Sequence, residues 1–116
     1  MKVAVTSQGQ SLNSEIDPRF GRTSGFVLFD TETRDVSYLD NSDNQSLAQG
    51  AGIKTAQTLS KAGVQVVLTG HLGPKAAQAL SHSNIAVYAC QAGTVQQALE
   101  SYKQSRLNYL TPEDAE

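Results

Sequence analysis

The chain has 116 residues, with nine Lys or Arg against eleven Asp or Glu, and its formal net charge is −2. This length and a hydrophobic share of 39% fit one globular domain with a real core. We expect no signal peptide, membrane span or DNA-coating function, because apolar runs are short and no Lys/Arg cluster occurs, and the single cysteine favours a reducing cytoplasm.

The first third of the chain has the pattern of three strands. Residues 2–6 form a mostly apolar run that is typical of a buried strand, and residues 26–29 form a second one. The polar stretch between them, residues 8–20, is long for a connection, and long irregular loops are often functional. A compact polar turn over residues 30–35 leads to a short third strand over 36–39, so these last two strands should form a hairpin.

Helices and strands alternate in the rest of the chain. We expect a loop over 41–46, a helix over 47–62, a strand over 64–69, a helix over 74–81, a strand over 85–89 and a last helix from residue 95. Pro74 suits a first helical position, and Thr94 with Gln97 has the capping-box pattern. Gly50 and Gly52 weaken the first turns of their helix, which suggests close packing or a backbone that approaches something.

The order of these elements predicts the fold class. Strands that alternate with helices pair in parallel through right-handed crossovers, and the opening hairpin adds an antiparallel part. We therefore predict an α/β protein with a mixed five-stranded sheet and helices on its faces. One domain should cover residues 1–107, and residues 108–116 should form a short acidic tail.

The candidate site lies where the parallel strands end. Ligands of open α/β sheets bind beyond the carboxyl ends of the strands, and here that edge carries residues 7–9, 70–75 and 90–94. Two helices begin there, and their free N–H groups favour anions. The loop over residues 8–22 adds Arg19 and Arg22, so the edge holds an anion-attracting rim with one imidazole, His71, and one thiol, Cys90.

Each of these features also has an ordinary explanation. Residues 70–74 could form only a tight turn, and Cys90 directly follows an apolar strand and could be a buried, inert thiol. Arg19 and Arg22 could pair with acidic neighbours in their own loop. The convergence of the features at one edge is what favours a site.

Motifs of dedicated catalysis are missing from the sequence. The chain has no G-x-G-x-x-G after its first strand, no His/Cys pair with zinc spacing and no G-x-S-x-G nucleophile motif. Its carboxylates scatter among turns and the tail instead of clustering. We therefore expect a protein that is not an enzyme.

Three motifs in this order resemble the dinitrogenase iron–molybdenum cofactor biosynthesis family, whose members include nitrogenase accessory factors. They are residues 17–22 (DPRFGR), 50–53 (GAGI) and 69–76 (TGHLGPKA), and the similarity runs over residues 1–102. The resemblance implies a ribonuclease-H-like fold and a non-enzymatic carrier of the iron–molybdenum cofactor or its precursors. A small member of the family from sulfate reducers binds a mixed molybdenum–copper sulfide cluster, and this chain is of similar size.

The resemblance also implies which residues would hold such a cluster. Several nitrogenase carriers have a cofactor-binding histidine just before the Phe of the first motif, where this chain has Arg19, and an arginine holds an anionic cluster by charge and hydrogen bonds. The expected metal ligands are His71 and Cys90, although one cysteine cannot supply the usual ligands of an iron–sulfur cluster. The expected cofactor-binding residues are Arg19, Phe20, Gly21, Arg22, Gly70, His71, Leu72, Gly73, Lys75, Gly93 and Thr94.

Two functions follow as hypotheses. The first is a cytoplasmic carrier that cradles an anionic molybdenum-containing metal–sulfur cluster, of the molybdenum–copper sulfide or iron–molybdenum type, and exchanges it with a donor or acceptor protein. Backbone N–H groups of residues 70–76 and 93–95 would form the cradle. The second is a metal-free interaction module that docks on a partner through the same loops. No nucleic acid or membrane is expected as a partner.

Overall fold

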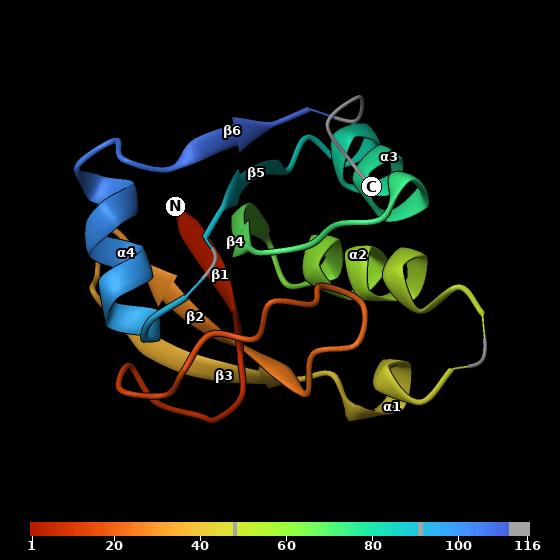
Figure 1. The fold of residues 1–116 in the computed structure, drawn as a ribbon, viewed down its shortest axis with the longest axis horizontal. Coiled ribbons are helices and arrows are strands. Elements are labelled where there is room, and N and C mark those ends of the chain that lie inside the picture. Colours follow the sequence, from red (N-terminus) through yellow and green to blue (C-terminus); the bar gives the residue numbers. More distant parts are fainter. Residues whose placement is uncertain (48, 91, 112–116) are drawn as a thin grey trace.

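The apolar strands form one mixed sheet in the computed structural model, which describes residues 1–47, 49–90 and 92–111 (Figure 1). The sheet has six strands in the described chain, in the order β3-β2-β1-β4-β5-β6. Their bounds are β1 (Lys2–Ser7), β2 (Gly25–Asp30), β3 (Val36–Asp40), β4 (Val64–Thr69), β5 (Ala86–Ala89) and β6 (Asn108–Leu110). β1, β4 and β5 run parallel, whereas β2, β3 and β6 pair antiparallel with their neighbours. The expected hairpin and parallel crossovers are confirmed.

The prediction of five strands was wrong, because β6 pairs with β5 at the edge of the sheet. This strand occupies residues 108–110, where the acidic tail was expected to begin. β6 has only three residues, which show no clear alternation of polar and apolar side chains, so this segment becomes a strand only because it pairs with β5. The rest of the expected tail, residues 112–116, lies outside the described residues.

The helices of the described chain are α1 (Ser42–Gln45), α2 (Ala51–Lys61), α3 (Pro74–His82) and α4 (Val95–Lys103). α1 lies in the stretch expected to be a loop, and α2 begins four residues later than expected. Gly50 explains the later start, because it takes a left-handed φ of 75° just before α2. The capping box of α4 is confirmed, since Thr94 and Gln97 bond each other's backbone N–H groups.

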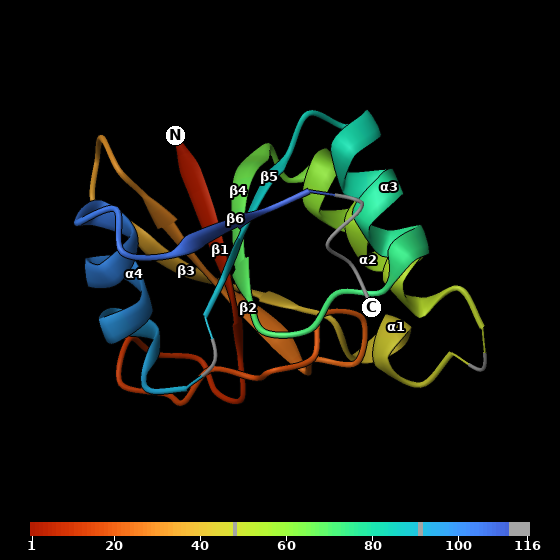
Figure 2. The same ribbon diagram turned by 45° about the horizontal axis from the view of Figure 1, so that its top comes forward.

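The helices cover both faces of the sheet, with α2 and α3 on one face and α4 on the other (Figure 2). Side chains along a strand alternate between the faces, so Ala4 packs in the core under α2 and α3, while Val3 and Val5 pack under α4. Burial on both faces explains why the strands read as continuous apolar runs. Because the two core clusters fill both faces of the sheet, the loops at its carboxyl edge are the place where a binding site can form.

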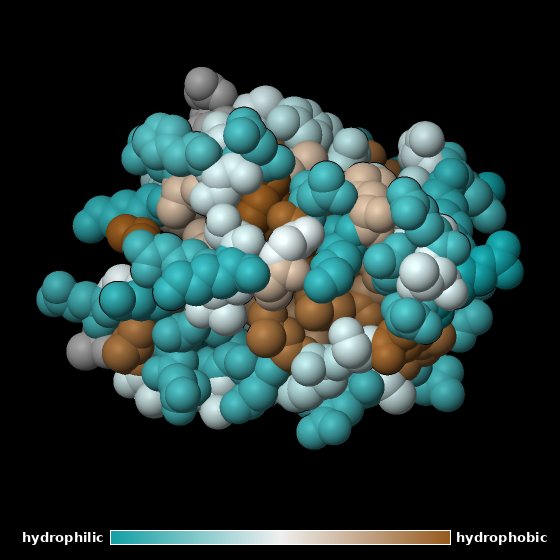
Figure 3. Space-filling model, turned by 180° about the vertical axis from the view of Figure 1, so that it is seen from behind, coloured by the Kyte–Doolittle hydropathy of each residue, from teal (hydrophilic) through white to brown (hydrophobic). Residues whose placement is uncertain are grey.

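On the face of the molecule that Figure 3 shows, hydrophilic side chains predominate and apolar residues appear in patches between them. Met1, Val36 and Tyr109 are the large hydrophobic side chains that the described chain exposes. None of the helices in the described ranges has the length and apolar character needed to cross a bilayer.

Candidate functional site

The loop between β1 and β2 runs along the carboxyl edge of the sheet and is fastened to it at several points. The backbone N–H of Ile16 donates to the Gly93 carbonyl at 3.0 Å, and that of Phe20 donates to the His71 carbonyl at 3.2 Å. Ile16 and Phe20 are also buried, one in each core cluster. The loop therefore joins the turns that follow β4 and β5, as the sequence analysis expected of one common edge.

Arg19 is paired within this loop. The buried Asp17 carboxylate accepts the backbone N–H of Arg19 at 2.9 Å and its Nε at 3.3 Å. The Arg19 side chain is nevertheless 60% exposed, and the backbone of Arg19 forms an isolated parallel β-bridge with His71, which is exposed as well. The ion pair considered as an ordinary explanation therefore exists, and the backbone bridge keeps Arg19 beside the turn that follows β4.

A pocket of about 490 Å³ opens where α2 and α3 begin. Its walls are the described residues 20–22 of the long loop, 50–53 at the start of α2 and 73–76 at the start of α3. α2 and α3 lie side by side on one face of the sheet, so their first turns meet at the same end of the molecule (Figure 1). Residues that are about 30 and 50 positions apart in the sequence thus share one cavity.

Small residues let the three walls of the pocket approach one another closely. A Cβ atom on Gly21 would lie 2.9 Å from the backbone nitrogen of Gly52, and a Cβ on Gly52 would lie 2.8 Å from the Cβ of Ala76. Real Cβ atoms essentially never approach another heavy atom this closely, so larger residues would push the walls apart. The close approach that Gly50 and Gly52 suggested in the sequence is confirmed for Gly52.

The charges around this pocket have one sign. Arg22 and Lys75 line it, and among the described lining residues none is an Asp or Glu. Within the described chain, no side chain caps the N-terminus of α2 or α3. The first-turn N–H groups of α2 therefore remain for another acceptor, as do those of Lys75 and Ala76 in α3, where Pro74 has no N–H. Helix dipoles add partial positive charge at the same place. Phe20, Ile53 and Pro74 form an apolar part of the wall. The pocket therefore suits an anion whose surface is weakly hydrated.

Arg22 also bonds to the chain outside the pocket. One terminal nitrogen of its guanidinium donates to the carbonyl of Gln45 at 2.9 Å and also to the carbonyl of Leu47. These bonds tie the connection between α1 and α2 to the pocket wall. A guanidinium has five N–H donors, so this arrangement leaves donors for an anion in the pocket.

The other expected binding residues lie outside this pocket. Leu72 is buried in the core beneath α3, and a Cβ on Gly70 would touch the Pro18 carbonyl at 2.8 Å, so this turn packs against the long loop. Gly93, with a φ of 105°, and Thr94 contact residues 15 and 16 instead. The expected rim is therefore divided, and only Phe20, Gly21, Arg22, Gly73 and Lys75 of the expected set line the pocket.

Cys90 lies on the far side of the sheet from the pocket, in the core cluster under α4. It is 5% exposed, and burial raises the pKa of its thiol to about 12. Thiolates rather than thiols bind soft metals, so this protonated group is a poor ligand near neutral pH. The ordinary explanation of Cys90 as a buried thiol matches its surroundings.

The donor set also bears on how a metal–sulfur cluster would fit. In the described parts of the chain, no three His, Cys, Asp or Glu side chains gather closely enough to hold a metal ion. The described residues thus show no set of side chains for a bare metal ion, whereas a preformed anionic cluster needs only charge and N–H donors. The pocket supplies both.

Sequence reasoning missed the α2 wall of the pocket, residues 50–53. Their signal was present in Gly50 and Gly52, which the sequence analysis placed in the first turns of a helix, where Ala is about 1 kcal/mol better than Gly. The motif was noted for the family resemblance, but the sequence alone did not show that α2 begins beside residues 20–22 and 73–76.

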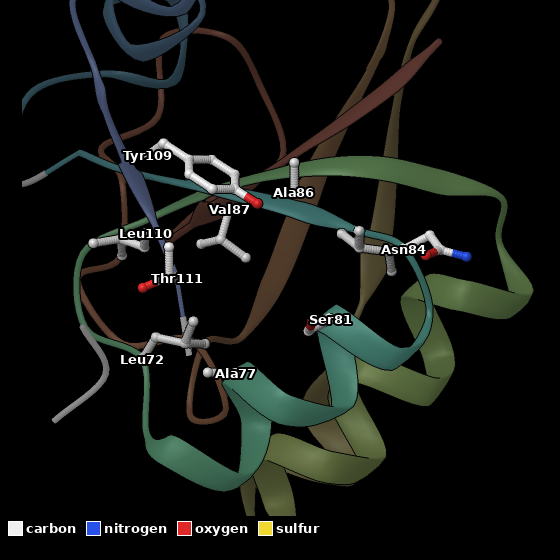
Figure 4. Close-up of a pocket in the computed structure, with 10 residues that line it drawn as sticks. Leu72, Ala77, Ser81, Asn84, Ala86, Val87, Tyr109, Leu110 and Thr111 are labelled. Atoms are coloured by element: carbon white, nitrogen blue, oxygen red, sulfur yellow. The ribbon is translucent and has the colours of Figure 1, made fainter. Parts of the chain in front are cut away.

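A second pocket, of about 310 Å³, lies between α3 and the β5–β6 edge (Figure 4). Leu72, Val87 and Leu110 give it apolar walls, and Ser81 and Asn84 add polar groups. None of its described lining residues is charged, so it lacks the means to attract an anion. The pocket at the start of α2 and α3 is the better candidate site.

The fold and site define an α/β protein with an anion-attracting pocket at the carboxyl edge of its sheet. The chain belongs to the dinitrogenase iron-molybdenum cofactor family, whose model matches residues 1–105. The resemblance seen in the sequence motifs is thus confirmed over nearly the whole chain.

Solved structures and a curated relative are similar to this chain over most of its length. The apo form of the orange protein from Desulfovibrio gigas is 43% identical, with a TM-score of 0.92 over 94% of this chain and 92% of that one. A Thermotoga protein of the DUF35 family is 34% identical, with a TM-score of 0.85 over 95% and 93%. An uncharacterized protein of Methanocaldococcus jannaschii is 22% identical over 92% of this chain and 89% of its own length.

Proposed function

We propose that this chain is a non-catalytic carrier that holds an anionic molybdenum-containing metal–sulfur cluster in the pocket between the starts of α2 and α3. The observation that carries the proposal is the set of donors around this pocket: two uncapped helix N-termini, Arg22 and Lys75, without a carboxylate among the described lining residues. The family, named for the iron–molybdenum cofactor, and the likeness to the orange protein support the cluster as the anion.

Cluster binding would be electrostatic. First-turn N–H groups of α2 and α3 would donate to the sulfides, and Arg22 and Lys75 would balance the negative charge. The apolar side chains of Phe20 and Ile53 would exclude water from the cluster and strengthen these interactions. Arg19 and His71 lie along the same edge and would approach the cluster from the loop side. The cluster, of the molybdenum–copper sulfide or iron–molybdenum type, would bring its own sulfides.

A carrier of this kind would work in the cytoplasm, where a single reduced cysteine is stable, and would exchange its cluster with a donor or acceptor protein. Arg22, Pro74 and Lys75 line the pocket and are exposed, so the pocket opens to the outside, which suits transfer of the cluster.

The strand order β3-β2-β1-β4-β5, in which β3, β2 and β1 pair antiparallel, supports the ribonuclease-H-like assignment that the resemblance implies.

The test is a titration of the metal-free protein with the molybdenum–copper sulfide formed from tetrathiomolybdate and copper(I), followed by visible absorption. We expect wild type to bind and the Arg22→Gln/Lys75→Gln double variant to bind at least about a hundredfold more weakly, because each charge-assisted bond contributes about 1.5–3 kcal/mol and the variant loses two of them. The control is Lys103→Gln/Arg106→Gln, which removes the same charge at the end of α4.

Wild-type affinity in the control and loss in the pocket variant would support the carrier function. Equal loss in both would mean that only net charge matters and that the pocket is not the site. If wild type takes up neither this cluster nor tetrathiomolybdate, the carrier proposal fails, and the metal-free interaction module becomes the better hypothesis.

A further inference from the structure

Directly after β3 the chain buries an amide side chain that lies outside the pocket lining and outside the family motifs. Asn41 is 2% exposed, yet it carries a polar group that can make several hydrogen bonds. Burying such a group is unfavourable unless its bonds are satisfied. Among the described residues no buried side-chain nitrogen or oxygen lacks a partner, so the surroundings of Asn41 are built to match it.

The Asn41 side chain bonds to three separate segments. Its Nδ2 donates to the carbonyl of Thr23 at 3.0 Å, and its Oδ1 accepts from Thr55 Oγ1 at 3.2 Å and from Asn44 Nδ2 at 3.0 Å. The backbone N–H of Asn41 also donates to the Ser24 carbonyl at 2.9 Å. One side chain therefore connects the long loop, α1 and α2.

Two of these partners belong to segments that wall the pocket. Thr23 is the next residue after Arg22, and its own hydroxyl donates to the carbonyls of Ser7 and Gly25, which anchors it to the sheet. Thr55 is fully buried on α2, within one turn of the pocket residue Ile53. The amide of Asn41 thus fixes the start of α2 relative to the loop that carries Arg22.

We propose that Asn41 is a positioning residue that sets the separation between the loop wall and the α2 wall of the pocket, and so determines the size of the anion that fits. This inference rests on the proposed function of the pocket. The Asn41 amide both donates to the Thr23 carbonyl and accepts from Thr55, whereas an isosteric carboxylate has no donor and would repel the carbonyl. Arg22 and Lys75 attract the anion, whereas Asn41 determines how far apart the walls are.

An apolar core would give comparable stability at this place, because replacing a bonded buried pair by apolar groups is often nearly neutral. A hydrogen-bonded network instead contributes structural specificity, because it is satisfied in one arrangement of the joined segments and is broken in others. The predicted consequence of disturbing it is a change in which anion binds, in excess of any change in stability.

The test compares Asn41→Asp, Thr55→Val and Thr55→Ser with the control Ala98→Gly. Thr55→Val keeps the shape but removes the donor to Asn41, and Thr55→Ser keeps the donor. Ala98 is buried in α4 on the opposite face of the sheet, and glycine there costs about 1 kcal/mol of helix stability. Thermal unfolding ranks the stability losses, so that binding is compared between variants of similar stability.

Two probes of different size are titrated, tetrathiomolybdate alone and the larger molybdenum–copper sulfide formed from it with copper(I). For Thr55→Val and Asn41→Asp we expect the ratio of the two affinities to change about tenfold from wild type. Thr55→Ser restores the wild-type ratio, and Ala98→Gly keeps it. If Asn41→Asp does not fold, the comparison of Thr55→Val with Thr55→Ser tests the role of Asn41 on its own.

An unchanged ratio in Thr55→Val, or an equal change in Ala98→Gly, would overturn the role of Asn41 while leaving the carrier function intact. Failure of wild type to bind either probe would overturn the carrier function and this inference with it. The two failures are therefore distinguishable in the same experiment.

Discussion

Alkaline pH should destabilise this protein through Cys90. The thiol is buried under α4, and desolvation raises its pKa from an ordinary value of 9.0 to about 12. A raised pKa means that the unfolded chain loses its proton first, so the contribution of the thiol to stability is fully present below pH 9 and decreases as the pH rises from 9 toward 12.

The magnitude follows from these two pKa values. At pH 10 an unfolded thiol with a pKa of 9.0 is about ten parts thiolate to one part thiol, whereas the folded thiol with a pKa of about 12 stays almost fully protonated. Ionisation then favours the unfolded chain by RT ln 11, about 1.4 kcal/mol, relative to pH 7. This is a substantial part of the stability of a small domain.

Urea unfolding of wild type and Cys90→Ala at pH 7 and pH 10 measures this contribution. Burial and Tyr88 also raise the pKa of Tyr102, but that group is present in both proteins and cancels in the comparison. Wild type should lose about 1.4 kcal/mol more than the variant between the two pH values. Equal losses would refute the reasoning and would mean that the Cys90 thiol ionises as readily in the fold as outside it.

Three further predictions concern the pocket and its surroundings. Arg22→Ala should speed amide hydrogen exchange in the α1–α2 connection, because two carbonyl contacts are lost, and unchanged exchange would contradict this. Gly21→Ala should lower the unfolding free energy by about 1–3 kcal/mol through its clash with Gly52, whereas Gly73→Ala, whose Cβ meets nothing within 4 Å, should be nearly neutral in the same urea experiment. Thr94→Ala should cost about 1 kcal/mol in thermal unfolding through the lost capping box, without weakening cluster binding.

The elements with strong local signals could be predicted from the sequence. The strand over 64–69 and the capping box at Thr94 depend on nearby residues alone, and both are as expected. β6 could not be found in this way, because three residues of ordinary composition become a strand only by pairing with β5. The start of α2 was misplaced because the left-handed Gly50 separates it from the residues before it.

The candidate site was predicted in part, for a similar reason. Strand ends and helix starts identify the edge of the sheet, so the sequence could name Arg22, Gly73 and Lys75, which line the pocket. Which turns share a cavity depends on tertiary packing. The close contacts at Gly21 and Gly52 bring the starts of α2 and α3 together, whereas Thr94 is bridged to the other end of the long loop.

The central claim is that the pocket between α2 and α3 binds the metal–sulfur anion. Amide NMR shifts recorded while the molybdenum–copper sulfide is added to the protein test it most directly. We expect the largest shifts at residues 51–53 and 75–76, with small shifts at Cys90 and Thr94. Shifts centred on residues 93–95, or spread evenly over the surface, would contradict it.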